Sequence, residues 1–353
     1  MITISVCMIV KNEEKVLARC LDTLHGLADE IIIVDTGSAD ATKEIAAGYT
    51  DKLYDFPWID DFSAARNFAF SKATMEYIYS ADADEILDEE NRRRFQLLKQ
   101  TLLPEIEIVQ MKYANQLEFN TTYNYDVEYR PKLYKRLRTL RWEEPIHENV
   151  VLSPVIYDSE ITVIHKPVSS HAGRDFAIYQ RIIKRDGKLS PKLYEMYARE
   201  LLIAGTDRDF QEAFSFFLEF AEREEGTIRE RKICESILLK CCLTNNDLTG
   251  ILKYGLRNIA DGKGCSEVCF LLGEFFYRLM DYKEATIWYY NAAYETESEL
   301  NIHYSGDYPL LRLAECYRNL GNTEQEMEFL RLYNNWSIPH GGDSFDGEHT
   351  KYI

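Results

Sequence analysis

The feature that most constrains this chain is the alternation of strand-like and helix-like segments near its N-terminus. Short segments rich in Ile, Val and Tyr alternate with segments whose apolar residues recur at helical spacing. This order predicts a mostly parallel sheet with right-handed crossover helices, because parallel neighbours need a connection long enough to return across the sheet. The expected strands are 2–10, 30–34, 52–56 and 77–81, and the expected helices are 13–27, 39–47 with Ser38 as N-cap, and 62–73.

The pattern changes twice farther along the chain. Segments 106–119, 127–137 and 161–167 are longer, more polar strands that we expect to be antiparallel. After about Arg174 the strand signals stop, and the remaining sequence has the apolar spacing of paired helices. Three of the pairs share a pattern. In the first helix a small residue stands one or two positions before a Glu, and the second helix begins with a segment that contains Glu. The small residues are Ala198, Gly273 and Ala314. This repetition predicts a tetratricopeptide-type array, with an unrelated helical bundle as the alternative because the spacing is irregular.

The expected fold class is therefore α/β in the N-terminal part, followed by an all-α helical-repeat domain. We place the first domain at residues 1–172 and the helical repeats at 173–337. Residues 338–353 form a C-terminal tail that matches no pattern. A chain of 353 residues is long enough to give each domain its own core.

Charge and composition exclude several classes of partner. The net charge is −18, from 41 basic and 59 acidic residues, so nucleic acids and anionic membrane surfaces are poor partners. No apolar segment is long enough to span a bilayer, which predicts a cytoplasmic protein. The eight cysteines form no Cys-x2-Cys pair, so we expect no disulfide framework; thiols buried on helices are the preferred interpretation, with a metal pair at Cys265-x3-Cys269 as the alternative.

Two closely spaced carboxylates end the strand at 77–81. Asp82 and Asp84 lie two positions apart, which places both side chains on the same side of an extended chain. A hard divalent cation is the usual partner of such a pair, often shared with a phosphate of the substrate. The alternative is that this acidic run, which continues to Glu90, only favours the N-terminus of the next helix through its dipole.

Three other segments accompany this pair in a fixed order. They are Val6–Glu14 at the end of the first strand, Val34–Thr42 at the end of the second, and Phe62–Asn67 at the start of the third helix. With these motifs, residues 1–150 resemble the family 2 nucleotide-sugar glycosyltransferases of GT-A fold. The helical repeats also occur in members of this family, including bacterial enzymes that glycosylate peptides or proteins.

The resemblance implies a role for each motif residue. Asp35 would accept a hydrogen bond from uracil, and Arg66 would contact the base or the diphosphate; a turn-forming Asp and a surface ion pair are the respective alternatives. Asp84 would be the direct ligand of Mn²⁺ or Mg²⁺, with Asp82 close to the ribose and the metal. The full expected donor-binding set is Val10, Asn12, Glu13, Asp35, Arg66, Asn67, Ala81, Asp82 and His147.

Transfer with inversion also needs a general base. The segment Trp142–Glu148 contains two candidates, of which Glu148 is preferred and Glu144 is the second choice. His147 between them could contact the donor phosphates or the metal, while an ordinary Pro-bounded turn is the alternative for the whole segment. His165, at the end of the last expected strand, is a further metal ligand implied by the fold, although a lone His is often structural.

The resemblance thus implies an inverting, metal-dependent glycosyltransferase that moves a sugar from a UDP-sugar donor to a protein or peptide side chain. A cell-surface polysaccharide or lipid-core acceptor is one alternative, and a non-catalytic scaffold with a degenerate nucleotide-binding domain is another. Neither Gly-x-Gly-x-x-Gly nor Gly-x4-Gly-Lys-Ser/Thr is present, which disfavours a dinucleotide fold and a P-loop enzyme. A nucleotidyltransferase is disfavoured because Lys11–Glu14 lacks the expected Gly-rich basic loop. Helical repeats are also compatible with a homodimer.

Overall fold

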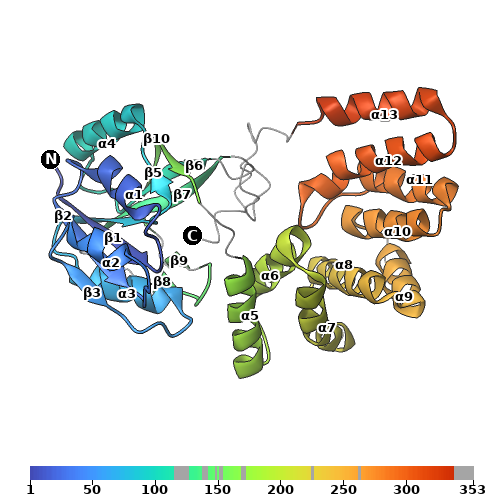
Figure 1. The fold of residues 1–353 in the computed structure, drawn as a ribbon, viewed down its shortest axis with the longest axis horizontal. Coiled ribbons are helices and arrows are strands. Elements are labelled where there is room, and N and C mark those ends of the chain that lie inside the picture. The colour runs from blue at the N-terminus through green and yellow to red at the C-terminus, as the bar shows by residue number, and fades with distance from the viewer. Residues whose placement is uncertain are drawn as a thin grey trace. The chain divides into compact units, whose positions relative to one another are not determined.

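A computed structural model of the chain divides into two compact units at His171/Ala172, shown in Figure 1. The structure describes residues 1–114, 127–136, 142–147, 149–150, 154–167, 172–223, 226–260 and 264–337. The predicted fold class, an α/β part followed by paired helices, is confirmed. No helix in the described part of the chain is long and apolar enough to cross a membrane.

The first unit is built on an eight-stranded sheet in the order β3-β2-β1-β4-β7-β6-β10-β5. Its strands are β1 (Ile4–Val10), β2 (Glu30–Asp35), β3 (Leu53–Asp55), β4 (Tyr77–Ala81), β5 (Glu85–Ile86), β6 (Ile108–Ala114), β7 (Glu128–Lys135) and β10 (Ile156–His165). Strands β1 to β4 pair in parallel, as the alternating pattern predicts, so their carboxyl ends meet at one edge. Two short strands, β8 (Trp142–Glu143) and β9 (Asn149–Val150), form a separate ribbon.

Helices cover both faces of this sheet. They are α1 (Leu17–Leu24), α2 (Thr42–Ala47), α3 (Phe62–Lys72) and α4 (Glu89–Thr101). Alternate residues of β1 point to opposite faces, with Met8 in the cluster that contains the apolar residues of α1 and α4, and Cys7 in the cluster that contains those of α3. Strands buried on both sides explain why β1 and β2 are nearly continuous apolar runs.

Several expected bounds and pairings are wrong. The helix expected at 13–27 is shorter and spans only Leu17–Leu24; the amides of Glu13 and Glu14 before it donate to the side chains of Thr42 and Asp40 in the loop after β2. The helix expected at 39–47 begins at Thr42, and Ser38 does not cap it, because the Ser38 hydroxyl instead accepts a hydrogen bond from the Asn12 amide.

The second half of the sheet also differs from expectation. Strand β10 is longer than the segment 161–167 and pairs in parallel with β6, while only β6 and β7 are antiparallel neighbours among the three expected strands. Strand direction depends on the path of the connection, and the alternation of side chains is the same for both directions. The two-residue strand β5 was not expected, because it is too short to carry a period.

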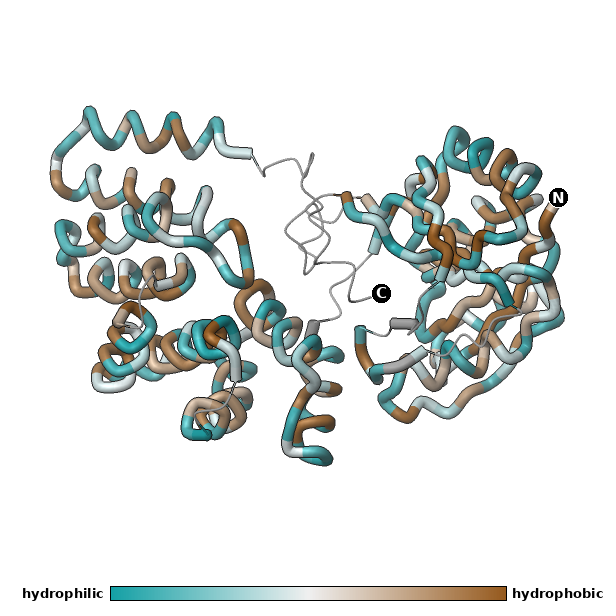
Figure 2. The backbone as a smooth tube through the Cα atoms, turned by 180° about the vertical axis from the view of Figure 1, so that it is seen from behind, coloured by the Kyte–Doolittle hydropathy of each residue, from teal (hydrophilic) through white to brown (hydrophobic). Residues whose placement is uncertain are grey.

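The second unit consists of helices packed in antiparallel pairs. They are α5 (Ala172–Asp186), α6 (Pro191–Ala204), α7 (Asp207–Glu222), α8 (Ile228–Asn245), α9 (Leu248–Ala260), α10 (Ser266–Arg278), α11 (Tyr282–Tyr290), α12 (Asp307–Asn319) and α13 (Thr323–Asn335), with a π-helical turn η1 (Asn291–Glu295) and a 3-10 turn η2 (Ile302–Ser305). The predicted close approach at Gly273 is confirmed, since an added Cβ would lie 2.5 Å from the Tyr289 ring. In Figure 2 each of these helices carries both apolar and polar residues, as expected of helices with one buried face.

Candidate functional site

The carboxyl edge of the parallel strands is organised by hydrogen bonds between the loops after β1 and β2. The Asn12 side chain accepts from the Ala39 amide at 2.8 Å, and the Glu13 amide donates to the Thr42 hydroxyl at 2.7 Å. The Val10 carbonyl accepts from the Thr36 amide at 3.0 Å. The predicted residues Val10, Asn12 and Glu13 therefore build the rim of this edge, beside Asp35, which lies opposite Val10 in the strand register.

Asp35 is buried at this edge, with 1% of its surface exposed. Its Oδ1 accepts hydrogen bonds from the amides of Gly37 at 2.9 Å and Ser38 at 3.0 Å, and Lys43 lies 3.7 Å away. Its Oδ2 has no hydrogen-bond partner among the described residues. A buried carboxylate oxygen without a donor is costly, so this atom is available to a ligand N–H group.

Arg66 forms the second part of the site. Helix α3 begins at Phe62, and the preceding Asp61 caps it, because its side chain accepts from the Ala64 amide at 3.0 Å. One turn later the Arg66 guanidinium donates to Ser80 Oγ at 2.8 Å and to Asp82 Oδ1 at 2.9 Å. Burial alone would raise the pKa of Asp82, but the positive charges of Arg66 and Lys132 outweigh it and hold that pKa well below its usual range. Asp82 is thus kept ionised and oriented by Arg66.

Asp84 and His165 form the pair best suited to a metal. Strand β5 pairs with β10 in a register that sets Glu85 opposite His165, and the Lys166 amide donates to the Asp84 carbonyl at 2.8 Å. As a result, Asp84 Oδ2 lies 3.1 Å from His165 Nε2. Two cis ligands of one octahedral ion, with bonds of about 2.1 Å, are separated by about 3.0 Å.

This donor set fits a divalent ion with remaining positions filled by a ligand. A carboxylate with an imidazole suits Mn²⁺ better than Mg²⁺, which prefers oxygen alone. No group of three or more His, Cys, Asp or Glu side chains in metal-binding proximity occurs among the described residues. Asp82 is paired with Arg66, so among the described residues the side chains that could hold a metal are those of Asp84 and His165.

Glu85 and Lys132, to which the sequence analysis gave no role, lie directly behind this pair. Glu85 Oε1 accepts from Lys132 Nζ at 2.7 Å, and both side chains are buried. Glu85 Oε2 accepts from the Asp82 amide at 3.2 Å. Burial raises the pKa of Glu85 to about 7, against the opposing effect of Lys132. The sequence around Lys132 also contains Arg130 and Lys135, so nothing local distinguishes this lysine from its neighbours.

The segment that begins at Trp142, which contains the expected base, is hydrogen-bonded to helix α3. Asn67 donates to the Trp142 carbonyl at 3.0 Å and accepts from the Trp142 amide at 2.9 Å, and the Phe62 amide donates to the Pro145 carbonyl at 2.9 Å. Arg66 lies over the Trp142 ring at 5.1 Å. Asn67 therefore holds this segment in place.

The expected general bases lie in or beside this fastened segment. Glu144 and His147 have positive φ angles of 70° and 48°, a sparsely populated conformation for such residues. Glu148, the preferred base, lies outside the described residues. Ala81, at the end of β4, is buried and contributes its position in the strand to the site.

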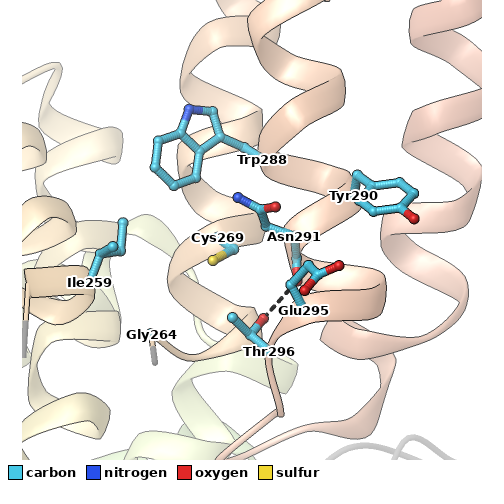
Figure 3. A pocket seen from close by; sticks show the side chains of 8 residues that line it. All are labelled: Ile259, Gly264, Cys269, Trp288, Tyr290, Asn291, Glu295 and Thr296. Atoms are coloured by element: carbon cyan, nitrogen blue, oxygen red, sulfur yellow. Dashed lines mark hydrogen bonds between the residues drawn. The ribbon is translucent and has the colours of Figure 1, made fainter. Parts of the chain in front are cut away.

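A separate cavity of about 390 Å³ lies in the helical unit. Figure 3 shows its lining, which combines the Trp288 and Tyr290 rings with the Asn291 amide and the Glu295 carboxylate near the π-helical turn η1. The Thr296 hydroxyl donates to the Asn291 carbonyl at 2.9 Å. The described residues of the lining include neither a cationic side chain nor a pair of carboxylates, the groups that would hold a diphosphate.

Comparison with known proteins gives one family match. Residues 5–152 match the model of the glycosyl transferase family 2. A TPR repeat-containing protein of Synechococcus elongatus is 34% identical over 180 residues, which cover 49% of this chain and 43% of that protein. The SPbeta prophage-derived glycosyltransferase SunS of Bacillus subtilis is 24% identical over 260 residues, covering 68% of this chain and 58% of that protein.

Two further similarities concern the N-terminal part. The lipopolysaccharide core biosynthesis glycosyltransferase LpsC of Rhizobium meliloti is 29% identical over 164 residues, covering 42% of this chain and 57% of that protein. Among solved structures, glucosyl-3-phosphoglycerate synthase from Mycobacterium tuberculosis with Mg²⁺ and UDP is 15% identical and covers 54% of this chain and 81% of that chain, at a TM-score of 0.38. The chain spans about half the length of the curated relatives it matches.

Proposed function

We propose that the chain transfers a sugar from a UDP-sugar to an acceptor with inversion at the anomeric carbon, because residues 5–152 match the glycosyl transferase family 2 model and form an α/β unit with a mostly parallel first half. The observation that carries the proposal is the assembly of three features at one edge of the sheet: a buried Asp35 oxygen with no partner among the described residues, the Arg66–Asp82 pair and the Asp84–His165 pair. These groups match, in order, a base, a ribose diphosphate and a divalent ion.

The uridine would bind with its ring N–H donating to Asp35 Oδ2. The Gly37 and Ser38 amides already fix the other oxygen, so Asp35 needs no rearrangement to accept this bond. Cytosine presents an acceptor at the same ring position and would face the carboxylate unfavourably. Asp35 is therefore the group that would select uracil.

Asp84 and His165 would hold Mn²⁺ or Mg²⁺, which when bound stabilises the negative charge of the departing UDP. Arg66 supplies a fixed positive charge at the same edge, already oriented by Ser80 and Asp82. The acceptor atom would attack the anomeric carbon while the bond to the UDP oxygen breaks. The acceptor proton would pass to a carboxylate of the segment after Trp142, for which Glu148 and Glu144 are the candidates.

A protein or peptide side chain is the acceptor class that the chain supports best. The cavity near η1 offers aromatic rings, an amide and a carboxylate, groups that suit amino-acid side chains. The second candidate is a saccharide of lipopolysaccharide-core type, which the LpsC similarity favours over the N-terminal part alone.

UDP-sugar hydrolysis with Mn²⁺ tests the donor half of the proposal. We expect release of UDP by the full chain and its loss in Asp84→Asn. Asp88→Asn is the matched control, because Asp88 belongs to the same acidic segment but only caps α4. Full activity of Asp84→Asn, or equal loss in both variants, would contradict the assignment of the metal site.

The acceptor is tested with radiolabelled donor sugars offered to the full chain together with two acceptors. One is a library of synthetic peptides and the other a deacylated lipopolysaccharide core oligosaccharide. Label in peptides supports the first candidate. Label only in the oligosaccharide would replace it with the second.

A further inference from the structure

We propose that Lys132 is a positioning residue, which holds Glu85 so that the turn Asp82–Glu85 presents Asp84, and Asp84 alone, to the metal. The proposal rests on the proposed function for its catalytic consequence. Its structural part stands on contacts behind the turn that do not involve any ligand. This lysine lies 47 residues beyond Glu85 in the chain, outside the Asp82–Glu85 segment that it contacts.

A β-bulge in β7 directs the Lys132 side chain toward the turn Asp82–Glu85. In the β6–β7 ladder Val109 pairs with Leu133 and Gln110 pairs with Pro131, so Lys132 is the extra residue on β7. Pro131 has no amide hydrogen, which is compatible with a break in the ladder at this point. The ladder of β7 with β4 ends at Leu133 as well. Lys132 is thus free of regular pairing at the position beside the end of β4.

The bulge sends the Lys132 side chain into the protein, where 5% of the residue is exposed. Its Nζ lies 2.7 Å from Glu85 Oε1 and 5.8 Å from the ring centres of both Tyr79 and Tyr113. The Tyr113 ring in turn lies 5.4 Å from the ring of His165. Lys132 therefore lies between the Glu85 carboxylate and the rings of Tyr79 and Tyr113. The Tyr113 ring is the one that packs beside His165, the other proposed metal ligand.

Glu85 transmits this hold to the turn. Its Oε2 accepts from the Asp82 amide, and its own amide donates to the Asp82 carbonyl, each at 3.2 Å. These two bonds close a tight turn around Ala83 and Asp84. Because Glu85 is fixed at one oxygen by Lys132 and at the other by Asp82, its carboxylate cannot swing toward the metal position.

The charges around the turn explain why this hold is needed. Three carboxylates, those of Asp82, Asp84 and Glu85, lie within four residues and repel one another. Arg66 pairs with Asp82 and Lys132 pairs with Glu85. The Asp84 carboxylate has only the His165 imidazole at hydrogen-bond distance among the described residues. Without Lys132, Glu85 Oε1 would lose its hydrogen-bond donor, and the side chain would no longer be held at both oxygens.

Hydrogen exchange and ligand binding test the proposal on four full-length variants. They are Lys132→Met, Lys132→Arg, the double variant Glu85→Gln/Lys132→Met, and the matched control Lys112→Met. Lys112 also forms an ion pair on a neighbouring strand, but with the exposed Glu160 and away from the turn. Thermal unfolding verifies that each variant is folded.

In the ligand-free protein we expect Lys132→Met to speed amide exchange in the peptide that contains Asp82–Glu85 by about tenfold, as expected when a buried hydrogen bond is released. In the presence of Mn²⁺ we expect its affinity for UDP to fall by about tenfold or more. Lys132→Arg should restore both quantities substantially, and Lys112→Met should change neither. A purely structural lysine would lower the unfolding temperature without this selective effect on the turn.

Unchanged exchange at Asp82–Glu85 in folded Lys132→Met would overturn the proposal. If Lys132→Met does not fold, the double variant, which buries no unpaired charge, decides: its turn must exchange faster than in the wild type, and equal exchange overturns the proposal. Absence of Mn²⁺-dependent UDP binding by the wild type would instead contradict the proposed function, while the exchange result would still decide the role of Lys132.

Discussion

The substitution Asp35→Asn gives a sharp test of how the donor base would be recognised. The amides of Gly37 and Ser38 both donate to Oδ1, at 2.9 and 3.0 Å, so the side-chain carbonyl of the introduced asparagine would have to occupy that position. Its NH₂ group would then replace Oδ2, the buried oxygen that has no partner among the described residues. The change preserves shape and loop contacts, and it converts one acceptor into a donor.

The expected loss of UDP affinity follows from this exchange. A hydrogen bond to a charged group contributes about 1.5–3 kcal/mol, and each 1.4 kcal/mol is a factor of ten, so the Kd for UDP should rise by about 10- to 150-fold. Cytosine carries an acceptor where uracil carries the ring N–H. The affinity of the variant for CDP should therefore be unchanged or higher. The preference for UDP over CDP, expressed as the ratio of their Kd values, should become smaller or reverse.

Isothermal titration of UDP and CDP in the presence of Mn²⁺ measures both quantities. Asp55→Asn is the matched control, because Asp55 lies beside Asp35 in the strand register and binds the same Lys43 but is exposed. That variant should bind both nucleotides like the wild type. Wild-type affinity of Asp35→Asn for UDP, or an equal loss for UDP and CDP, would refute the reasoning.

Three further outcomes follow from the structure. His165→Ala should weaken Mn²⁺-dependent UDP binding and leave any metal-independent binding unchanged, measured by titration with and without EDTA; equal binding with and without His165 would exclude it as a ligand. Gly273→Ala should lower the free energy of unfolding by about 1–3 kcal/mol, measured by urea denaturation, because its Cβ would lie 2.5 Å from the Tyr289 ring. Hydrogen bonds from Lys52, Ser5 and Thr74 outweigh burial and lower the pKa of Glu30 from 4.5 to about 2. Because the folded-state pKa is depressed, this stabilisation of about 3 kcal/mol is present above pH 4.5 and is lost as the pH falls toward 2. In Glu30→Gln the free energy of unfolding should therefore depend less on pH between 4.5 and 2. An unchanged pH dependence would contradict this role of Glu30.

Much of the N-terminal fold was predictable because its signals are local. The apolar strands β1, β2 and β4 and the Gly-Ser break after Asp35 appear within short windows of sequence. The bounds of α1 and α2 were not predictable, because the backbone amides and hydroxyls around Asn12 and Ser38 bond to one another across the two loops. The direction of β10 was equally hidden, since parallel and antiparallel strands share the same alternation.

The sequence by itself determined that carboxylates follow the second and fourth strands and that an arginine opens the preceding helix. Parallel strand order then predicts that these groups meet at one edge. Only the tertiary structure decided which charge neutralises which: Arg66 binds Asp82, Lys132 binds Glu85, and His165 reaches Asp84 from a strand 81 residues later. Ion pairs and metal sites need contacts of a few ångströms. Such separations are set by strand register and by a bulge on β7, and neither can be read from local sequence.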